Sequence, residues 1–275
     1  MAEISLIFFT SLAQAAVGMI VLLAILPQKS AEPVRPVDGI CNYLDMHGGC
    51  ALITAIALFC LGVLFSFLHI SSPFVSFYTI TNVATSWLSR EILFVILFGV
   101  ACLTLFFMRT RMLHMLAAII GFGLVYVMSQ VYSNLPVAFW RSSLTLWVFL
   151  STALLLGSAT LLLVKTICHC RQNTSENIDF GILPLILMIA GALRLVFGIL
   201  QLICADWESA TLRTDLLFLH LCGVVLGMIL LFLAIQKNNK ALPFATLISM
   251  AVALFWAAEI CGRGMFCGAL TQFAM

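Results

Sequence analysis

Hydrophobic residues dominate the chain in eight long runs separated by short polar segments. The runs cover approximately 4–26, 49–69, 91–108, 112–132, 143–164, 180–204, 215–235 and 241–261. Each is about 18 to 25 residues long, the length that a helix needs to cross about 30 Å of hydrocarbon. The strands of a membrane barrel are instead about ten residues of alternating polarity. The pattern therefore predicts an all-α polytopic membrane protein, a bundle of eight transmembrane helices.

The first run is predicted to be a span rather than a cleavable signal peptide. Glu3 precedes it with no basic residue, whereas a signal peptide begins with basic residues and has a shorter apolar segment. The longest connection, 27–48, contains three prolines and mixed charge, which is typical of an irregular loop. The chain is therefore predicted to be one eight-span domain, residues 1–275.

Composition agrees with this class. Of the 275 residues, 63% are apolar and 9% charged, against about half and about a quarter in soluble proteins. The net charge of +2 is too small to indicate nucleic-acid binding. Cys168-His169-Cys170 is predicted to be a loop rather than a zinc site, because no second cluster stands at zinc-ligand spacing. No nucleotide, zinc-protease or hydrolase motif is present.

The basic residues of the connections predict the orientation. Eight follow odd-numbered spans: Lys29, Arg35, Arg109, Arg111, Lys165, Arg171, Lys237 and Lys240. Four lie on the opposite side: Arg90, Arg141, Arg213 and Arg263. This bias places the odd connections in the cytoplasm and both termini on the outer, periplasmic side. All five tryptophans, Trp256 included, are then expected on or near the outer face, as an interfacial belt.

Ionisable residues near the outer span ends are the candidates for chemistry. His69 ends span two and Glu91 opens span three, so the two can converge. His220 near the start of span seven, with Glu259 and Arg263 at the end of span eight, can complete a cluster under the outer surface.

Arg194 lies near the middle of span six. It is expected to form a salt bridge inside the bundle. The sequence does not identify its partner.

A cluster of this kind suits a pocket that oxidises a quinol. Such a pocket accepts two protons while two electrons leave, so it needs bases that exchange protons near neutral pH. Imidazole meets that need, and a partly desolvated carboxyl group can join it. Hydrogen bonds from these groups also orient the two ring oxygens.

Blocks of residues at the span ends carry a further signal. They are Phe67 to Pro73; Asn82-Val83 with Leu88 to Ile92; Val131-Tyr132 with Pro136, Trp140 and 149–157; and Glu259 to Phe266. In order and position they resemble the membrane anchor subunit of bacterial dimethyl sulfoxide reductases, over about a third of the chain.

The resemblance implies an anchor in the bacterial cytoplasmic membrane that oxidises menaquinol. It implies electron transfer to an iron–sulfur subunit and on to a molybdopterin catalytic subunit, with no haem in this chain. The cysteines do not form the grouped pattern that ligates an iron–sulfur cluster, so neither a cluster nor a metal site is expected here. The family's menaquinol-associated histidine and glutamate match His69 and Glu91. Candidates for the rest of the pocket are Ser72, Arg90, Tyr132, Glu259 and Arg263.

Other functions stay open at this stage. A b-type cytochrome would use His69 and His220 as haem ligands. A transporter would have broken helices at matching positions of two halves, which the Gly and Pro positions do not indicate. A structural anchor with an empty pocket is the remaining alternative. The terminal electron acceptor and the membrane face of the catalytic subunits do not follow from this sequence.

Overall fold

The computed structural model describes residues 2–26, 49–69, 82–134, 143–172, 180–203, 214–236 and 241–271. Within these ranges the chain forms eight helices and no strand. They are α1 (Ala2–Ile25), α3 (Gly49–His69), α5 (Trp87–Phe107), α6 (Arg111–Ser133), α7 (Leu144–Gln172), α8 (Leu183–Ile203), α9 (Thr214–Gln236) and α10 (Ala241–Thr271). All eight are long and apolar enough to cross a membrane, which confirms the predicted fold class.

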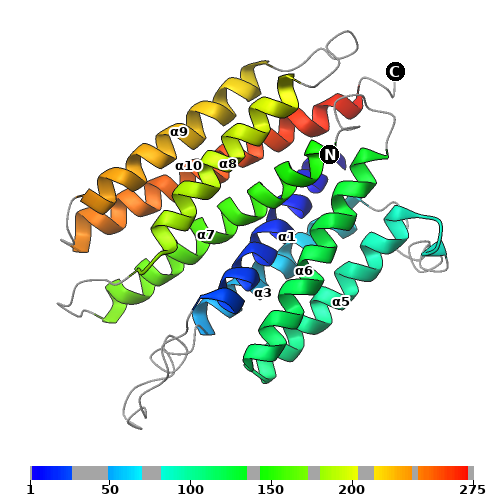
Figure 1. The fold of residues 1–275 in the computed structure, drawn as a ribbon, viewed down its shortest axis with the longest axis horizontal. Helices are drawn as coiled ribbons and strands as arrows, with labels where there is room; N and C mark the ends of the chain where they lie inside the picture. The colour runs from blue at the N-terminus through cyan, green and yellow to red at the C-terminus, as the bar shows by residue number, and fades with distance from the viewer. Residues whose placement is uncertain are drawn as a thin grey trace.

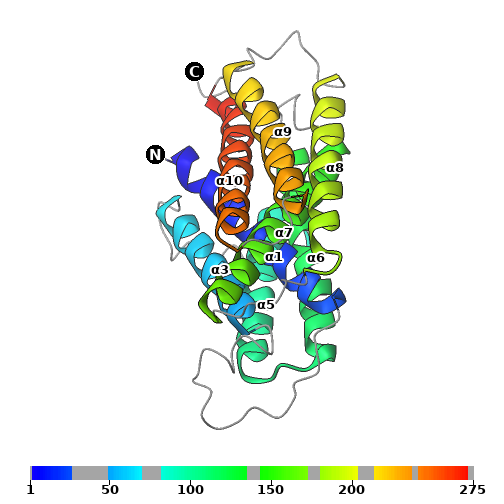
Figure 2. The same cartoon turned by 90° about the vertical axis from the view of Figure 1, so that its left-hand side faces the viewer.

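Helices α1 and α7 form the centre of the bundle. Helix α1 packs against α3, α6, α7 and α10, and most of its side chains are buried. Helices α3, α5 and α6 lie on one side of the central pair, and α8, α9 and α10 lie on the other (Figures 1 and 2). The outer helices expose many large apolar side chains, as expected of surfaces that face lipid.

The central helices approach closely at two glycines. A Cβ atom added to Gly18 would lie 1.9 Å from the carbonyl oxygen of Ala153, and one added to Gly157 would lie 2.5 Å from the carbonyl carbon of Gly18. Small residues allow helix backbones to approach in this way inside a membrane. The contact holds α7, which carries Phe149 and Thr152, against α1, which carries Gln14.

Helix α7 extends beyond its hydrophobic run. It continues to Gln172, so Cys168-His169-Cys170 is helical and the expected loop at this position is wrong. The segment after Val164 contains neither Gly nor Pro, the residues that most often end a helix. The hydroxyl of Thr166 also bonds the carbonyl of Leu162.

Helix α10 is also longer than predicted, because it continues past Cys261 to Thr271. Trp256 consequently lies in the middle of the helix rather than at the outer face, and its Nε1 donates to Oγ1 of Thr160 at 3.2 Å. Glu259 and Arg263 are likewise farther from the helix end than their sequence positions indicated.

The start of α1 and the end of α10 lie at the same end of the bundle (Figure 1). The end of α3, the start of α5, the end of α8 and the start of α9 share it, because successive helices alternate in direction. We call this the outer end, after the charge bias in the connections. Its location on the periplasmic side stays a prediction.

Candidate functional site

A buried ion pair joins α8 to α10. Nε of Arg194 lies 2.8 Å from Oε1 of Glu259, and the two side chains are 6% and 0% exposed. Thr152 on α7 donates a hydrogen bond to Oε2 of the same carboxylate at 2.9 Å. A charge removed from water needs such partners. Glu259 therefore provides the buried salt bridge that was expected for Arg194.

His220 on α9 lies beside this ion pair. Its Nδ1 is 2.8 Å from the carbonyl oxygen of Ala258 and 3.9 Å from Oε1 of Glu259. Because a carbonyl oxygen only accepts, Nδ1 carries the hydrogen of that bond. The other ring nitrogen, Nε2, is buried and has no hydrogen-bond partner among the described residues. Gly262 makes room for the ring, since a Cβ atom there would lie 2.8 Å from Nδ1.

Arg263 extends the cluster to α1 and α7. It donates a hydrogen bond to Oε1 of Gln14, and its Cζ lies 4.0 Å from the centroid of the Phe149 ring. Such a contact stabilises a guanidinium group away from water. Tyr132 on α6 packs against the same phenyl ring, edge to face, with centroids 5.5 Å apart. Arg263 and Tyr132, both expected in the pocket, are thus linked through Phe149.

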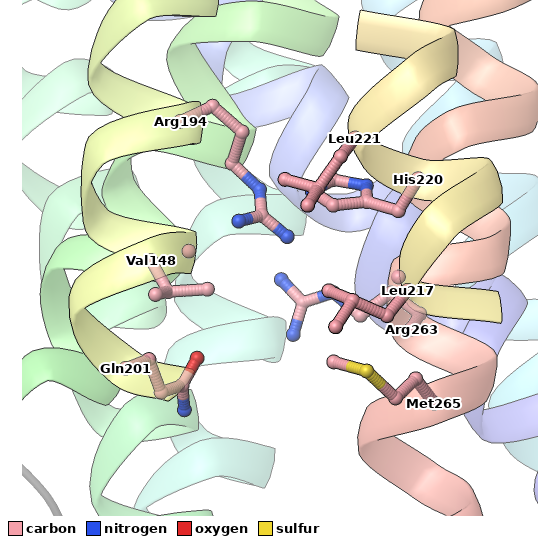
Figure 3. A pocket seen from close by; sticks show the side chains of 10 residues that line it. Val148, Arg194, Gln201, Leu217, His220, Leu221, Arg263 and Met265 are labelled. Atoms are coloured by element: carbon pink, nitrogen blue, oxygen red, sulfur yellow. The ribbon is translucent and has the colours of Figure 1, made fainter. Parts of the chain in front are cut away.

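A small cavity lies between α7, α8, α9 and α10 (Figure 3). Its polar lining consists of Arg194, Gln201, His220 and Arg263. The volume is about 20 Å³, enough for about one water molecule. Pockets for drug-sized ligands are about 300–1,000 Å³. In this conformation the cavity therefore has no room for a quinone headgroup.

Glu91 lies apart from this cluster. It occurs four residues into α5, about 6 Å along the helix axis, and is 7% exposed. No ion pair or hydrogen bond to its carboxyl group is present within the described part of the chain. The two buried glutamates therefore differ, because Glu259 has an arginine and a threonine as partners and Glu91 has neither among the described residues.

The residues expected in one cluster are divided by the central helices. His220, Glu259 and Arg263 come together, whereas Glu91 is on α5, which packs against α3 and α6. His69 is the last residue of α3, and its side chain lies outside the described part of the structure. Ser72 also lies outside the described residues.

Arg90 has a local structural role. Its Nε donates to the carbonyl of Val83 at 2.9 Å and its Nη2 to that of Ala84 at 2.7 Å. Its guanidinium group also lies over the ring of Trp87, with Cζ 4.2 Å from the centroid. Arg90 therefore holds the turn that precedes α5 against the first turn of that helix.

Sequence reasoning missed two partners in the cluster, Gln14 and Thr152, and one residue of the cavity, Gln201. Gln14 and Gln201 stand out as amides in apolar runs, which is a signal for a buried polar contact. Thr152 carries no such signal, because threonine commonly bonds its own helix. Among the described residues, no group of three or more His, Cys, Asp or Glu side chains is placed to hold a metal ion.

Comparison with known proteins identifies a family and a relative. The family described as DMSO reductase anchor subunit (DmsC) matches residues 1–269. The relative is one subunit of the anaerobic dimethyl sulfoxide reductase of Haemophilus influenzae. It is 26% identical over 290 residues, which cover 99% of this chain and 96% of the relative. No solved structure matches the chain significantly.

Proposed function

Because the chain belongs to the DMSO reductase anchor subunit (DmsC) family, we propose that it forms a single membrane-anchor domain that oxidises menaquinol. The electrons pass to an iron–sulfur subunit and on to a molybdopterin catalytic subunit. The complex lies in the bacterial cytoplasmic membrane. The family and the name of the Haemophilus influenzae relative support the assignment to an anaerobic respiratory complex.

We place the menaquinol site at the outer end, between the end of α3 and the start of α5. The observation that carries this proposal is the carboxyl group of Glu91, which is buried and has no cationic partner among the described residues. Such a group can gain or lose a proton without breaking an ion pair. Glu259 is held as a carboxylate by Arg194, so it suits a structural role better than proton exchange.

Oxidation of menaquinol breaks two O–H bonds and removes two electrons from the ring. His69 accepts the proton of one hydroxyl group and Glu91 that of the other. The electrons leave to the iron–sulfur cluster of the partner subunit. Glu91 is about 6 Å from the start of α5, and His69 is the last residue of α3. Both protons therefore have a short route to the outer surface.

The isoprenoid tail of menaquinol needs an apolar surface beside the site. Exposed apolar side chains near the outer end of α3 are Leu64, Phe67 and Leu68, and Leu88 is exposed in the first turn of α5. These side chains provide a path from the lipid to the headgroup. Arg90 fixes the turn before α5 and so positions Glu91 as its neighbour in sequence.

The two other functional classes have less support. A haem between His69 and His220 needs α3 and α9 to face each other, but α1 and α7 lie between the groups of helices that contain them. His220 also faces a cavity of only about 20 Å³. A transporter of the inverted-repeat type has broken helices, whereas each span of the described chain is one continuous helix.

Binding of a fluorescent quinol-site inhibitor tests the proposed site. We would compare membranes that contain the wild-type complex with membranes that contain His69→Ala or Glu91→Ala, and record a haem difference spectrum of each. Thr104→Ala is the matched control, because Thr104 lies on α5 at the opposite end from Glu91. Saturable binding that is lost only in the first two variants supports the proposal. Binding retained in both overturns it, and haem bands lost with His69 would identify a cytochrome.

A further inference from the structure

The turn between α5 and α6 is short and held by its own hydrogen bonds. Helix α5 ends at Phe107 and α6 begins at Arg111. The turn lies at the end of the bundle opposite to the end of α10 (Figure 1), which we call the inner end. Oγ1 of Thr110 accepts a hydrogen bond from the backbone N–H of Leu113 at 3.3 Å, and the backbone N–H of Thr110 donates to the carbonyl of Met108 at 2.9 Å. The turn therefore holds its side chains on a defined backbone.

Two arginines in this turn, Arg109 and Arg111, have no counter-charge. Their Cα atoms are two residues apart, at most about 7 Å, so both guanidinium groups can reach one ligand. Neither group has an ion pair or a hydrogen bond among the described residues. The acidic residues in the first turns of α1, α5 and α9 belong to the outer end, and Glu259 is held in the buried ion pair. Spans of this length separate the two ends of the bundle by about 30 Å.

The arginine at the opposite end of α5 is satisfied by the protein itself. Arg90 donates to the carbonyls of Val83 and Ala84 and lies over the ring of Trp87. The same helix thus has a guanidinium group with internal partners at its outer end and a pair without described partners at its inner end. An external anion can supply what the chain does not provide there.

The arginines lie between strongly exposed apolar side chains. Phe107 and Met112 are 74% and 79% exposed, so no described part of the protein covers them. The apolar surface continues along both helices with Val100, Leu103, Met115, Leu116 and Ile119. Acyl chains of a bilayer cover such a surface. The turn therefore joins positive charge to an apolar surface, at the position where a span meets the membrane boundary.

This combination matches the chemistry of an anionic phospholipid. A guanidinium group forms paired hydrogen bonds with phosphate oxygens, and basic residues beside a membrane attract anionic headgroups. A zwitterionic headgroup adds an ammonium group, which two arginines repel. We propose that the turn between α5 and α6 binds one anionic phospholipid. Arg109 and Arg111 hold its phosphodiester group, and its acyl chains lie on the surface that begins at Phe107 and Met112.

The bound lipid also has a structural consequence. Helix α5 packs mainly against α6 and much less against α3, so the two helices form a hairpin at the side of the bundle. A lipid held at the turn fixes the inner end of this hairpin at the membrane boundary. The inference does not depend on the proposed menaquinol site, which is at the other end of α5.

Native mass spectrometry of the delipidated complex, purified with its partner subunits in a neutral detergent, tests the inference. Phosphatidylglycerol is the probe, and phosphatidylcholine is titrated beside it. The wild type should bind the first phosphatidylglycerol molecule more tightly than phosphatidylcholine. Arg109→Gln/Arg111→Gln should weaken that binding by at least about tenfold, because two charges are lost. Arg109→Lys/Arg111→Lys retains both charges and should stay within about threefold of the wild type.

A second pair of substitutions separates a site from a general effect of charge. Lys237→Gln/Lys240→Gln removes two charges from another connection of the more basic side and should leave the binding unchanged. Glycerophosphoglycerol, which lacks acyl chains, and inorganic phosphate should not compete. The inference is overturned by equal binding in the wild type and the arginine-to-glutamine variant, by an equal loss in the lysine-to-glutamine variant, or by effective competition from either small anion. His69→Ala and Glu91→Ala should leave lipid binding unchanged even if they abolish menaquinol oxidation.

Discussion

Nε of Arg194 and Oε1 of Glu259 lie 2.8 Å apart in the interior of the bundle and connect α8 to α10. Their contact gives Glu259 a fixed partner, whereas Glu91 on α5 has none among the described residues. The two buried glutamates are therefore expected to respond differently to substitution. Loss of Glu259 should affect the fold, and loss of Glu91 should affect function.

Removal of one member of the buried ion pair should destabilise the protein. Arg194→Gln leaves the carboxylate of Glu259 without its cation, and such changes cost about 3–5 kcal/mol. Unfolding of the purified protein in mixed micelles measures the loss. Arg111→Gln, at an exposed position, should change the free energy of unfolding by less than about 0.5 kcal/mol.

The double variant Arg194→Leu/Glu259→Leu shows whether the loss of stability comes from leaving one buried charge without its partner or from losing the ion pair itself. It removes both charges, so it should be more stable than Arg194→Gln alone. If Arg194→Gln unfolds with the same free energy as Arg111→Gln, the ion pair does not stabilise the bundle and this account of Glu259 is wrong.

A methyl group at the crossing of the central helices should also be destabilising. Gly157→Ala would bring a Cβ atom to 2.5 Å from the backbone of Gly18, and overpacking of this kind costs about 1–3 kcal/mol. The free energy of unfolding in mixed micelles again provides the measurement. Gly264→Ala, whose Cβ atom has an ordinary contact, should be nearly neutral. Equal stability of the two variants would show that α1 and α7 can separate at this point without loss.

The distribution of basic residues predicts that both termini are periplasmic. Alkaline phosphatase is active only outside the cytoplasm, so a fusion after Met275 should be active. A fusion after Gln172, at the end of α7, should be inactive because that helix ends on the more basic side. The reverse pattern of activities would invert the orientation and place the Glu91 end of the bundle in the cytoplasm.

The sequence predicted the spans well because each one is a long apolar run. Helix α3 begins and ends at the predicted residues, Gly49 and His69. The ends of α7 and α10 were predicted too early, since polar side chains were assumed to mark the membrane surface. Arg263 shows why this assumption fails, because Gln14 and Phe149 satisfy its guanidinium group inside the bundle.

The candidate site was only partly predictable for a related reason. A hydrophobic run gives the depth of a residue but not which neighbouring helix it faces. With span eight ended at 261, Glu259 was placed at the outer surface and Arg194 near the middle of the membrane. The longer α10 brings the two to the same depth, and the packing of α8 and α10 against α7 brings their side chains together.

Menaquinol-dependent turnover of the complete complex tests the central proposal most directly. Glu91→Gln preserves shape and breaks no ion pair among the described residues, so this variant should fold normally. We predict that Glu91→Gln lowers menaquinol-dependent turnover by at least about 100-fold. Turnover with a soluble electron donor that bypasses the anchor should stay at the level of the wild type and of Thr104→Ala. Unchanged menaquinol-dependent turnover in Glu91→Gln would contradict the proposed site.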